Sequence, residues 1–156
     1  MIVPANLVRE VEVYAFSYAT EDEDKVEKAM KNLLPEDNRD LWLTRNTLKG
    51  YHGDPITIVT GKIRTKKGAT EVLRRVMQEL SSLDQQRMLN ETEERLDEGG
   101  NLYIRLDKQN AYRGKVSLLE TDPVKMKFRL RFPHGKDRVE YVRDIFHTII
   151  KGEPEA

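Results

Sequence analysis

The sequence predicts an α+β fold, in which helices cover one mainly antiparallel sheet, and three observations support this prediction. The chain has 156 residues, of which 38% are hydrophobic, and this suffices for one domain with an ordinary core. Segments with a two-residue apolar period and segments with a helical period both occur. Their order, β-α-β-β-α-α-β-β-β-α, lacks the strict alternation of a parallel doubly wound sheet. We therefore expect a single domain over residues 1–156, with a frayed tail at about 151–156.

The strands are identified by alternation and by β-branched residues. The first strand covers about 7–19, and its two faces carry Val11, Val13 and Ala15 on one side and Glu12, Tyr14 and Phe16 on the other. The next two strands are separated by Gly50–Pro55, where two glycines and a proline predict a sharp turn that contains His52. These two strands cover about 41–48 and 56–63, and the last three predicted strands cover about 102–107, 116–120 and 124–132.

The helices are identified by apolar stripes and by their end signals. Thr20 and Glu23 match a capping box, and Pro35 stops the helix that follows. Asp84 is the expected cap of a more polar helix, which Gly99 and Gly100 end. The other predicted helices cover about 69–82 and 137–150, and the polar helix covers about 84–97.

The composition excludes several classes of protein. The chain has no cysteine, which excludes disulfides, cysteine-based zinc sites and a thiol nucleophile. No apolar run approaches the roughly 20 residues that span a bilayer, and the first residues lack a signal-peptide pattern. We therefore expect a soluble, cytoplasmic protein with no membrane partner. The formal net charge is zero, but basic and acidic segments alternate along the chain, so a basic face is compatible with it.

No catalytic or metal-binding motif is present. The sequence contains neither a G-x-x-x-x-G-K-S/T phosphate loop nor a G-x-G-x-x-G motif. The three histidines are far apart, and none has a second histidine at helical spacing. The acidic cluster around Glu93–Glu98 is typical of a solvated helix face. We therefore predict a protein that is not an enzyme and that needs no metal or cofactor.

The strongest functional pattern is V-K-M-K-F-R-L-R-F at residues 124–132. One face of this predicted strand carries Lys125, Lys127, Arg129 and Arg131. Alternate side chains of a strand are about 6.6–7 Å apart, a spacing close to that of phosphates along a nucleic-acid strand. This pattern favours anion binding. Two alternatives stay open: the charges protect an edge strand from aggregation, or they pair with the acidic helix at 91–98.

Basic residues of neighbouring segments extend this candidate surface. Residues 108–115 form a predicted exposed turn after a strand, a place where binding groups commonly lie. Tyr112 in this turn is open to either a stacking or a structural role, whereas Tyr14 and Phe16 fit better in the core than in a base-stacking stripe. The further RNA-binding candidates are Arg105, Lys108, Gln109, Tyr112, Arg113 and Lys115, together with Lys62, Arg64, Lys66 and Lys67.

Four stretches resemble a small archaeal family that is described as RNA-binding and as predicted to associate with the exosome. They are T-E-D-E-D-K-V at 20–26, G-Y-H-G-D-P-I at 50–56, R-L-D-E-G-G-N-L-Y-I-R-L-D-K-Q at 95–109 and D-P-V-K-M-K-F-R at 122–129. The resemblance implies a fold like the large-subunit ribosomal protein that binds the smallest ribosomal RNA. It implies no enzymatic activity and no cofactor. Arg105, Asp107, Lys108 and Gln109 match the most specific part of the motif.

Two hypotheses follow from the sequence. The first is a non-catalytic RNA-binding domain that recognises the backbone and shape of RNA, with RNA-processing proteins or the exosome as further partners. The alternative is a protein–protein interaction module or a self-associating homodimer without nucleic-acid binding. A steep loss of RNA affinity with rising salt concentration would distinguish the RNA-binding hypothesis from the protein–protein one, because each phosphate contact releases counterions.

Overall fold

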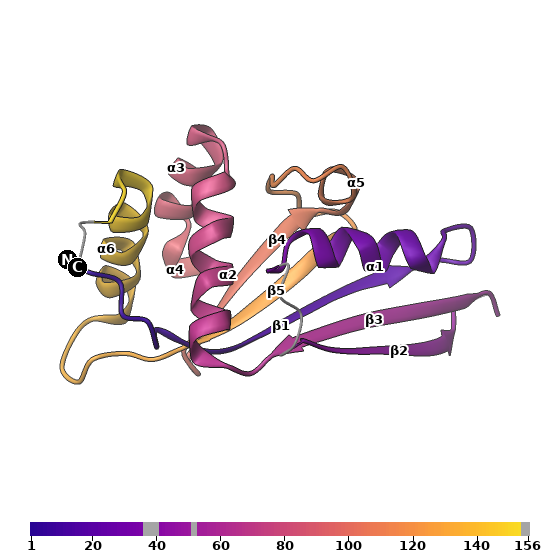
Figure 1. Ribbon diagram of the computed structural model, residues 1–156, viewed down its shortest axis with the longest axis horizontal. Coiled ribbons are helices and arrows are strands. Elements are labelled where there is room, and N and C mark those ends of the chain that lie inside the picture. Colours follow the sequence, from indigo (N-terminus) through magenta and orange to yellow (C-terminus); the bar gives the residue numbers. More distant parts are fainter. Residues whose placement is uncertain (36–40, 51–52, 154–156) are drawn as a thin grey trace.

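The computed structural model, which describes residues 1–35, 41–50 and 53–153, confirms the predicted α+β class and the order of strands and helices. Five antiparallel strands form one sheet with the order β2-β3-β1-β5-β4. In Figure 1 the helices lie above the sheet and beside its left end, and none of the described helices lies below it. The sheet therefore has one covered face and one face without helices, which we call the open face.

The strands and helices agree with most of the predicted boundaries. The strands are β1 (Val8–Ser17), β2 (Leu41–Lys49), β3 (Pro55–Ile63), β4 (Asn101–Asp107) and β5 (Pro123–Leu130). The helices are α1 (Glu23–Asn32), α2 (Lys66–Glu79), α3 (Ser82–Asn90), α4 (Thr92–Arg95), α5 (Lys108–Tyr112) and α6 (Arg138–Lys151).

The strand registers decide which side chains reach each face. Val11 of β1 lies opposite Ile63 of β3 and Phe128 of β5, and all three are buried on the covered face. Glu12, the next residue, lies between Lys62 and Lys127 on the open face. Because side chains alternate along a strand, this register assigns every residue of the sheet to one face.

The core lies between the covered face and the helices. Val72, Leu73 and Val76 of α2 are almost completely buried, and α2 packs against β1. The hydroxyl of Thr70 on the same helix accepts a hydrogen bond from the Val8 backbone N–H at 3.0 Å. This bond pairs a buried donor at the start of β1, a donor that would otherwise cost about 1–3 kcal/mol. At the end of the sheet, α6 packs against α2, α3 and α4.

The helix ends differ from the predicted ones in three places, and in one of them Ser81, rather than Asp84, caps α3 by accepting a hydrogen bond from the Asp84 N–H. Asp22, rather than Thr20, caps α1, and its carboxylate accepts a hydrogen bond from the backbone N–H of Asp24. The predicted helix at 84–97 is two helices, because the chain leaves helical geometry at Glu91. There the Thr92 hydroxyl donates to the Met88 carbonyl at 2.8 Å, a bond of the kind that bends helices.

Two predicted segments near β4 take other forms. The predicted strand at 116–120 makes a single bridge between Leu118 and Leu106 at the edge of β4. The predicted exposed turn at 108–115 begins with α5, which Asp107 caps by accepting a hydrogen bond from the Asn110 N–H. This short helix therefore follows directly on the strand.

Some predictions fall outside the described residues, namely the part of the predicted sharp turn that contains His52 and the last residues of the frayed tail. Over the described part of the chain, no helix has the length and apolar character that crossing a bilayer requires.

Candidate nucleic-acid interface

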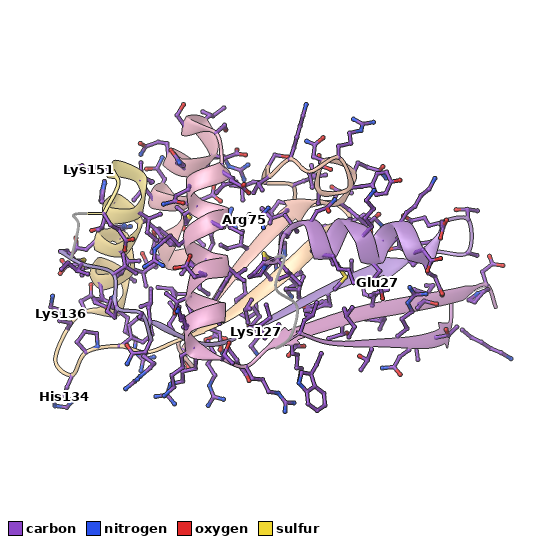
Figure 2. The ribbon with its side chains drawn as sticks, viewed as in Figure 1. Glu27, Arg75, Lys127, His134, Lys136 and Lys151 are labelled. Carbon is purple, nitrogen blue, oxygen red and sulfur yellow. The ribbon has the colours of Figure 1, made fainter. Side chains whose placement is uncertain are left out.

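The open face brings together cations and aromatic rings from all five strands. Side chains extend from both sides of the sheet, with Lys127 on β5 and Glu27 on α1 (Figure 2). By register, β5 contributes three cations to the open face, and β4 contributes a ring and a cation next to them. These residues of β5 and β4 are Lys125, Lys127, Arg129, Tyr103 and Arg105, and the neighbouring strands add Tyr14, Phe16, Trp42 and Lys62.

Lys125 lies at the centre of this group. Its ammonium is 5.3 Å from the centre of the Tyr14 ring and 5.2 Å from the centre of the Tyr103 ring. Cations are attracted to aromatic faces at these distances. The three side chains come from the adjacent strands β1, β5 and β4, so the sheet itself sets their spacing.

Asp97 fixes the position of Tyr103. The tyrosine hydroxyl donates to the Asp97 carboxylate at 3.0 Å. Burial and this hydrogen bond raise the pKa of Tyr103 above its ordinary value. The backbone N–H of Asn101 donates to the same carboxylate and is the main reason that the pKa of Asp97 is lowered. Asp97 therefore acts as a positioning residue for a ring on the open face.

The cations of β5 lack ion-pair partners among the described residues. This holds for Lys125, Lys127 and Arg129, and for Arg131, which is exposed just beyond the end of β5. Opposite charges do meet elsewhere in the molecule. The acidic segment at 91–98, which was the alternative partner of the β5 cations, instead pairs through Glu91 with arginines of its own helices.

Glu91 binds two arginines on the covered side. It accepts from Arg87 at 3.2 Å and from Arg95 at 2.8 Å. Burial alone would raise the pKa of Glu91, but the bond with Arg87 and the charge of Arg95 lower it. Glu120 lies within 4 Å of both arginines and of Arg105. Arg105 is thus partly neutralised by an ion pair, whereas no ion pair among the described residues includes a cation of β5.

A second group of basic residues lies at the end of the sheet where β3 finishes. Lys62 is 3.6 Å from the carboxylate of Glu12, and the guanidinium of Arg64 lies 5.1 Å from the centre of the Trp42 ring. Lys66 and Lys67 are exposed in the first turn of α2. The register places Lys62 level with Lys127, with Glu12 between them.

The structure removes Lys108 from the candidate interface. This residue is only 4% exposed, and its ammonium contacts Glu21 at 2.9 Å and Asp122 at 2.8 Å. It also donates to the Phe16 carbonyl at 3.0 Å. Burial would lower the pKa of Lys108, but the hydrogen bonds with Asp122 and Glu21 outweigh it and raise that pKa. Lys108 joins three segments of the fold, so we assign it a structural role in place of an RNA contact.

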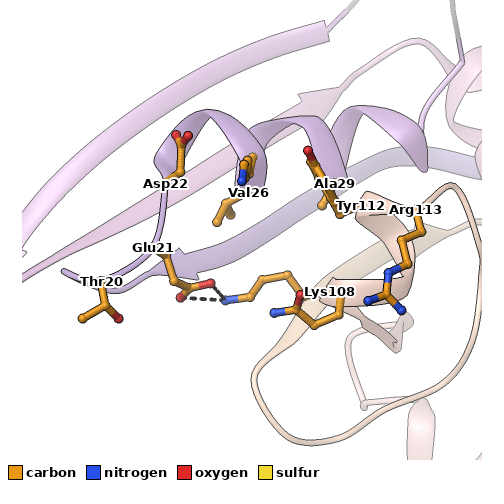
Figure 3. A pocket seen from close by; sticks show the side chains of 10 residues that line it. Thr20, Glu21, Asp22, Val26, Ala29, Lys108, Tyr112 and Arg113 are labelled. Carbon is orange, nitrogen blue, oxygen red and sulfur yellow. Dashed lines mark hydrogen bonds and ion pairs between the residues drawn. The ribbon is translucent and has the colours of Figure 1, made fainter.

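The other candidates of this segment lie on the covered side of the sheet. Gln109, Tyr112 and Arg113 line an open pocket of about 460 Å³ between α1 and α5, close to the Glu21–Lys108 pair (Figure 3). Lys28 of α1 lies 5.2 Å from the centre of the Tyr112 ring. Lys115 is exposed beyond α5. The predicted site is therefore two separate groups, one on the open face and one beside α1.

Sequence reasoning missed the aromatic part of the open face. The prediction that Tyr14 and Phe16 lie in the core is wrong, because the registers place them on the open face, where Phe16 is 39% exposed. Trp42, which no sequence pattern marked as a candidate, is 62% exposed. The alternation in β1 was the available signal, because Tyr14 shares its face with Glu12. No group of three histidine, aspartate or glutamate side chains among the described residues is arranged to hold a metal ion.

Comparison with known proteins agrees with a nucleic-acid role. A family model described as RNA binding matches residues 10–130. An RNA-binding protein of Pyrococcus abyssi is 33% identical over 133 residues, which are 83% of this chain and 86% of the relative. A DUF54 protein of Archaeoglobus fulgidus has a TM-score of 0.75 and 29% identity, and the match covers 88% of this chain and 99% of that one.

A second DUF54 structure, from Methanothermobacter thermautotrophicus, has a TM-score of 0.71 and 27% identity and covers 92% of this chain and 98% of its own. The two DUF54 structures are thus matched over nearly their whole length and share the fold. Because the family model spans most of the sequence and the Pyrococcus relative exceeds 30% identity, the chain belongs to this RNA-binding family.

Proposed function

We propose that the chain binds RNA on the open face of its sheet and does so without catalysing a reaction. The observation that carries this proposal is the group around Lys125, a cation between the rings of Tyr14 and Tyr103. Lys127 and Arg129 continue the same face and lack ion-pair partners among the described residues. Cations beside flat rings on an exposed sheet suit a ligand that has both phosphates and bases.

The charges of the open face suggest a path for the phosphates. Glu10 and Glu12 of β1 lie opposite Arg129 and Lys127, and carboxylates repel phosphates. The path therefore follows β5, on the side that faces Arg105 and Tyr103 of β4. Along β5, successive open-face cations are about 6.6–7 Å apart, so one strand of RNA can meet them in turn.

Recognition of this kind depends on backbone and shape. Phosphate contacts position a protein on nucleic acid and carry no direct sequence information. The rings add stacking, which tolerates every base. We therefore expect single-stranded RNA to bind more tightly than a duplex, since paired bases are not free to stack on Tyr14 and Tyr103. Lys125, Lys127, Arg129 and Arg131 form the main contacts on this path. A separate, secondary contact beyond Glu12 comprises Lys62, Arg64, Lys66 and Lys67.

Two features that the resemblance implies stay predictions, namely the association with the exosome or RNA processing and the likeness to a ribosomal protein, and so does the cytoplasmic location that the composition predicts. Identification of the RNA and proteins that copurify with the native chain tests the first of these. Gln109, Tyr112, Arg113 and Lys115 also stay candidates, as a second contact beside α1.

The test compares tyrosines on the two sides of the sheet. Fluorescence anisotropy measures the affinity of a single-stranded oligoribonucleotide for Tyr14→Leu, Tyr103→Leu and Tyr112→Leu. Loss of a stacking ring costs about 1–3 kcal/mol per base, so each of the first two variants should bind roughly 5- to 150-fold more weakly. Tyr112→Leu tests the separate candidate contact beside α1, because this ring lies on the covered side, and its loss should weaken binding less than the loss of Tyr14 or Tyr103. Weak binding by Tyr112→Leu alone would place the RNA beside α1 and contradict the proposal.

A further inference from the structure

The two edges of the sheet differ in how they are protected. At β4, the Asp107 N–H donates to the Ser117 carbonyl at 2.8 Å, and the Arg105 carbonyl accepts from Leu119 at 3.1 Å. The Asn101 carbonyl accepts from Asp97 at 3.0 Å. The chain's own backbone therefore covers the β4 edge at both ends.

At β2, no described residue pairs with the outer edge. This strand has nine residues, contains no proline and pairs with β3 without a register shift. Its residues from Thr44 onward are all exposed. Proteins commonly protect such an edge with charges, but the central charge of β2 is used elsewhere. Arg45 turns to α1, where it is 2.9 Å from Asp24 and 3.3 Å from Glu27.

The apolar residues of β2 are placed symmetrically. Trp42 and Leu48 are 62% and 55% exposed, and both lie on the open face. Each is three residues from Arg45. If two β2 strands pair antiparallel about a two-fold axis at Arg45, Trp42 of each copy lies opposite Leu48 of the other, and Thr44 lies opposite Asn46.

The hydrogen-bond pattern permits this register. Gly50 donates to the Asp54 carbonyl at 2.6 Å, and these residues continue the β2–β3 ladder. In an antiparallel ladder, hydrogen-bonded pairs alternate with pairs that are not hydrogen-bonded. Even-numbered residues of β2 therefore bond to β3, and Arg45 and the other odd-numbered residues point their N–H and C=O groups outward. Pairing about Arg45 matches odd-numbered residues with odd-numbered ones, as an antiparallel ladder requires.

We propose that β2 is a homodimer interface, in which two copies of this chain join their sheets edge to edge at this register. The strand that pairs with β2 is β2 of a second copy, because the two outer edges match in three respects. They have the same length, their outward N–H and C=O groups belong to residues that face one another, and Trp42 of each copy lies opposite Leu48 of the other. The carboxylates that surround each Arg45 offset the repulsion between the two guanidinium groups at the axis. The axis is perpendicular to the sheet, so both open faces lie on the same side of the dimer.

Sedimentation equilibrium without RNA tests the proposal on the full chain. We expect the wild type to approach twice 18.2 kDa as its concentration rises to about 100 μM, a range in which weak interfaces are populated. Trp42→Lys with Leu48→Lys places like charges opposite each other and should weaken the dimer about tenfold or more. Trp42→Lys with Leu48→Glu changes the same exposed positions but places opposite charges across the axis, and it should dimerise more strongly than the double-lysine variant.

Single cysteines test the register, because the chain has no cysteine of its own. Thr44 and Asn46 of two copies form a pair that is not hydrogen-bonded, with Cα atoms about 4.5 Å apart, a distance that a disulfide can span. A mixture of Thr44→Cys and Asn46→Cys chains should give a disulfide-linked dimer on mild oxidation, and much more of it than either variant alone. Leu83→Cys, exposed on α3, is the control. A wild type that stays monomeric at every concentration, or cross-linking no greater than that of Leu83→Cys, would overturn the proposal. So would equal dimerisation by the two charge variants.

Discussion

Replacement of Lys108 by methionine tests the structural role of this residue. Methionine keeps most of the length and apolar volume of the side chain but removes the charge. The change leaves the carboxylates of Glu21 and Asp122 without their shared counter-ion and the Phe16 carbonyl without its donor. These groups belong to the end of β1, the loop before α1 and the turn before β5, so the loss loosens three segments together.

The magnitude follows from the burial of the partners. Removal of one member of a fully buried ion pair costs about 3–5 kcal/mol. The side chains of Glu21 and Asp122 are 24% and 37% exposed, so water can partly replace the ammonium. We therefore expect the free energy of unfolding to fall by about 2–3 kcal/mol, which lowers the melting temperature by roughly 4–12 °C for a chain of this length.

Urea and thermal unfolding measure the loss, with Lys115→Met as the matched control. Lys115 is exposed and has no ion pair among the described residues, so its loss should change stability by less than about 0.5 kcal/mol. An RNA titration of each variant completes the test. If Lys108→Met kept full stability and lost RNA affinity, the structural role would be refuted and Lys108 would be an RNA contact after all.

Two further predictions concern pH and the backbone. The pKa of Lys108 is raised in the folded state, so the stabilisation by its charge is complete below the unfolded pKa of about 10.4. This stabilisation is lost as the pH rises through the folded pKa. Denaturant titrations between about pH 8 and 12 should therefore show a smaller alkaline loss of stability in Lys108→Met than in the wild type. Gly53 has a φ of 83°, and a Cβ atom added at this residue would meet no other atom within 4 Å, so Gly53→Val should lower the free energy of unfolding by about 1–3 kcal/mol through backbone strain alone. Gly53→Asn should lower it less, because asparagine tolerates this backbone region. A urea titration that shows equal losses for both variants would contradict the argument.

Alternation along the chain predicted the sheet well, because it is a local property. In β1, Val11 and Val13 define the covered face, and the structure confirms both as buried. The same alternation already placed Tyr14 beside Glu12 on the other face. The prediction that Tyr14 and Phe16 lie in the core is wrong because burial is only a general tendency of aromatic residues, whereas the alternation is specific to this strand.

The role of Lys108 could not be predicted in the same way. Its partner Glu21 is 87 positions away in the sequence, and only the folded chain brings the two together. The segment at 116–120 shows a related limit. Its residues were predicted as a strand, but they meet only the edge of β4, so a single bridge forms. In both cases the local sequence gives the residue types, but contacts between distant segments determine that Lys108 is buried in ion pairs and that the segment at 116–120 forms only a bridge.

The salt dependence of RNA binding tests most directly whether RNA lies on the open face. The variant combines Lys125→Ser, Lys127→Ser and Arg129→Ser, and its control, with the same change in net charge, combines Lys31→Ser, Lys136→Ser and Lys151→Ser outside the sheet. For single-stranded RNA, each lost phosphate contact reduces the slope of log affinity against log salt by about 0.7. We predict that the open-face variant has a slope shallower by about 2, with stability preserved because Met126 and Phe128 keep the buried face intact. The control should keep the wild-type slope. An unchanged slope in the open-face variant, or an equal reduction in the control, would contradict RNA binding on the open face.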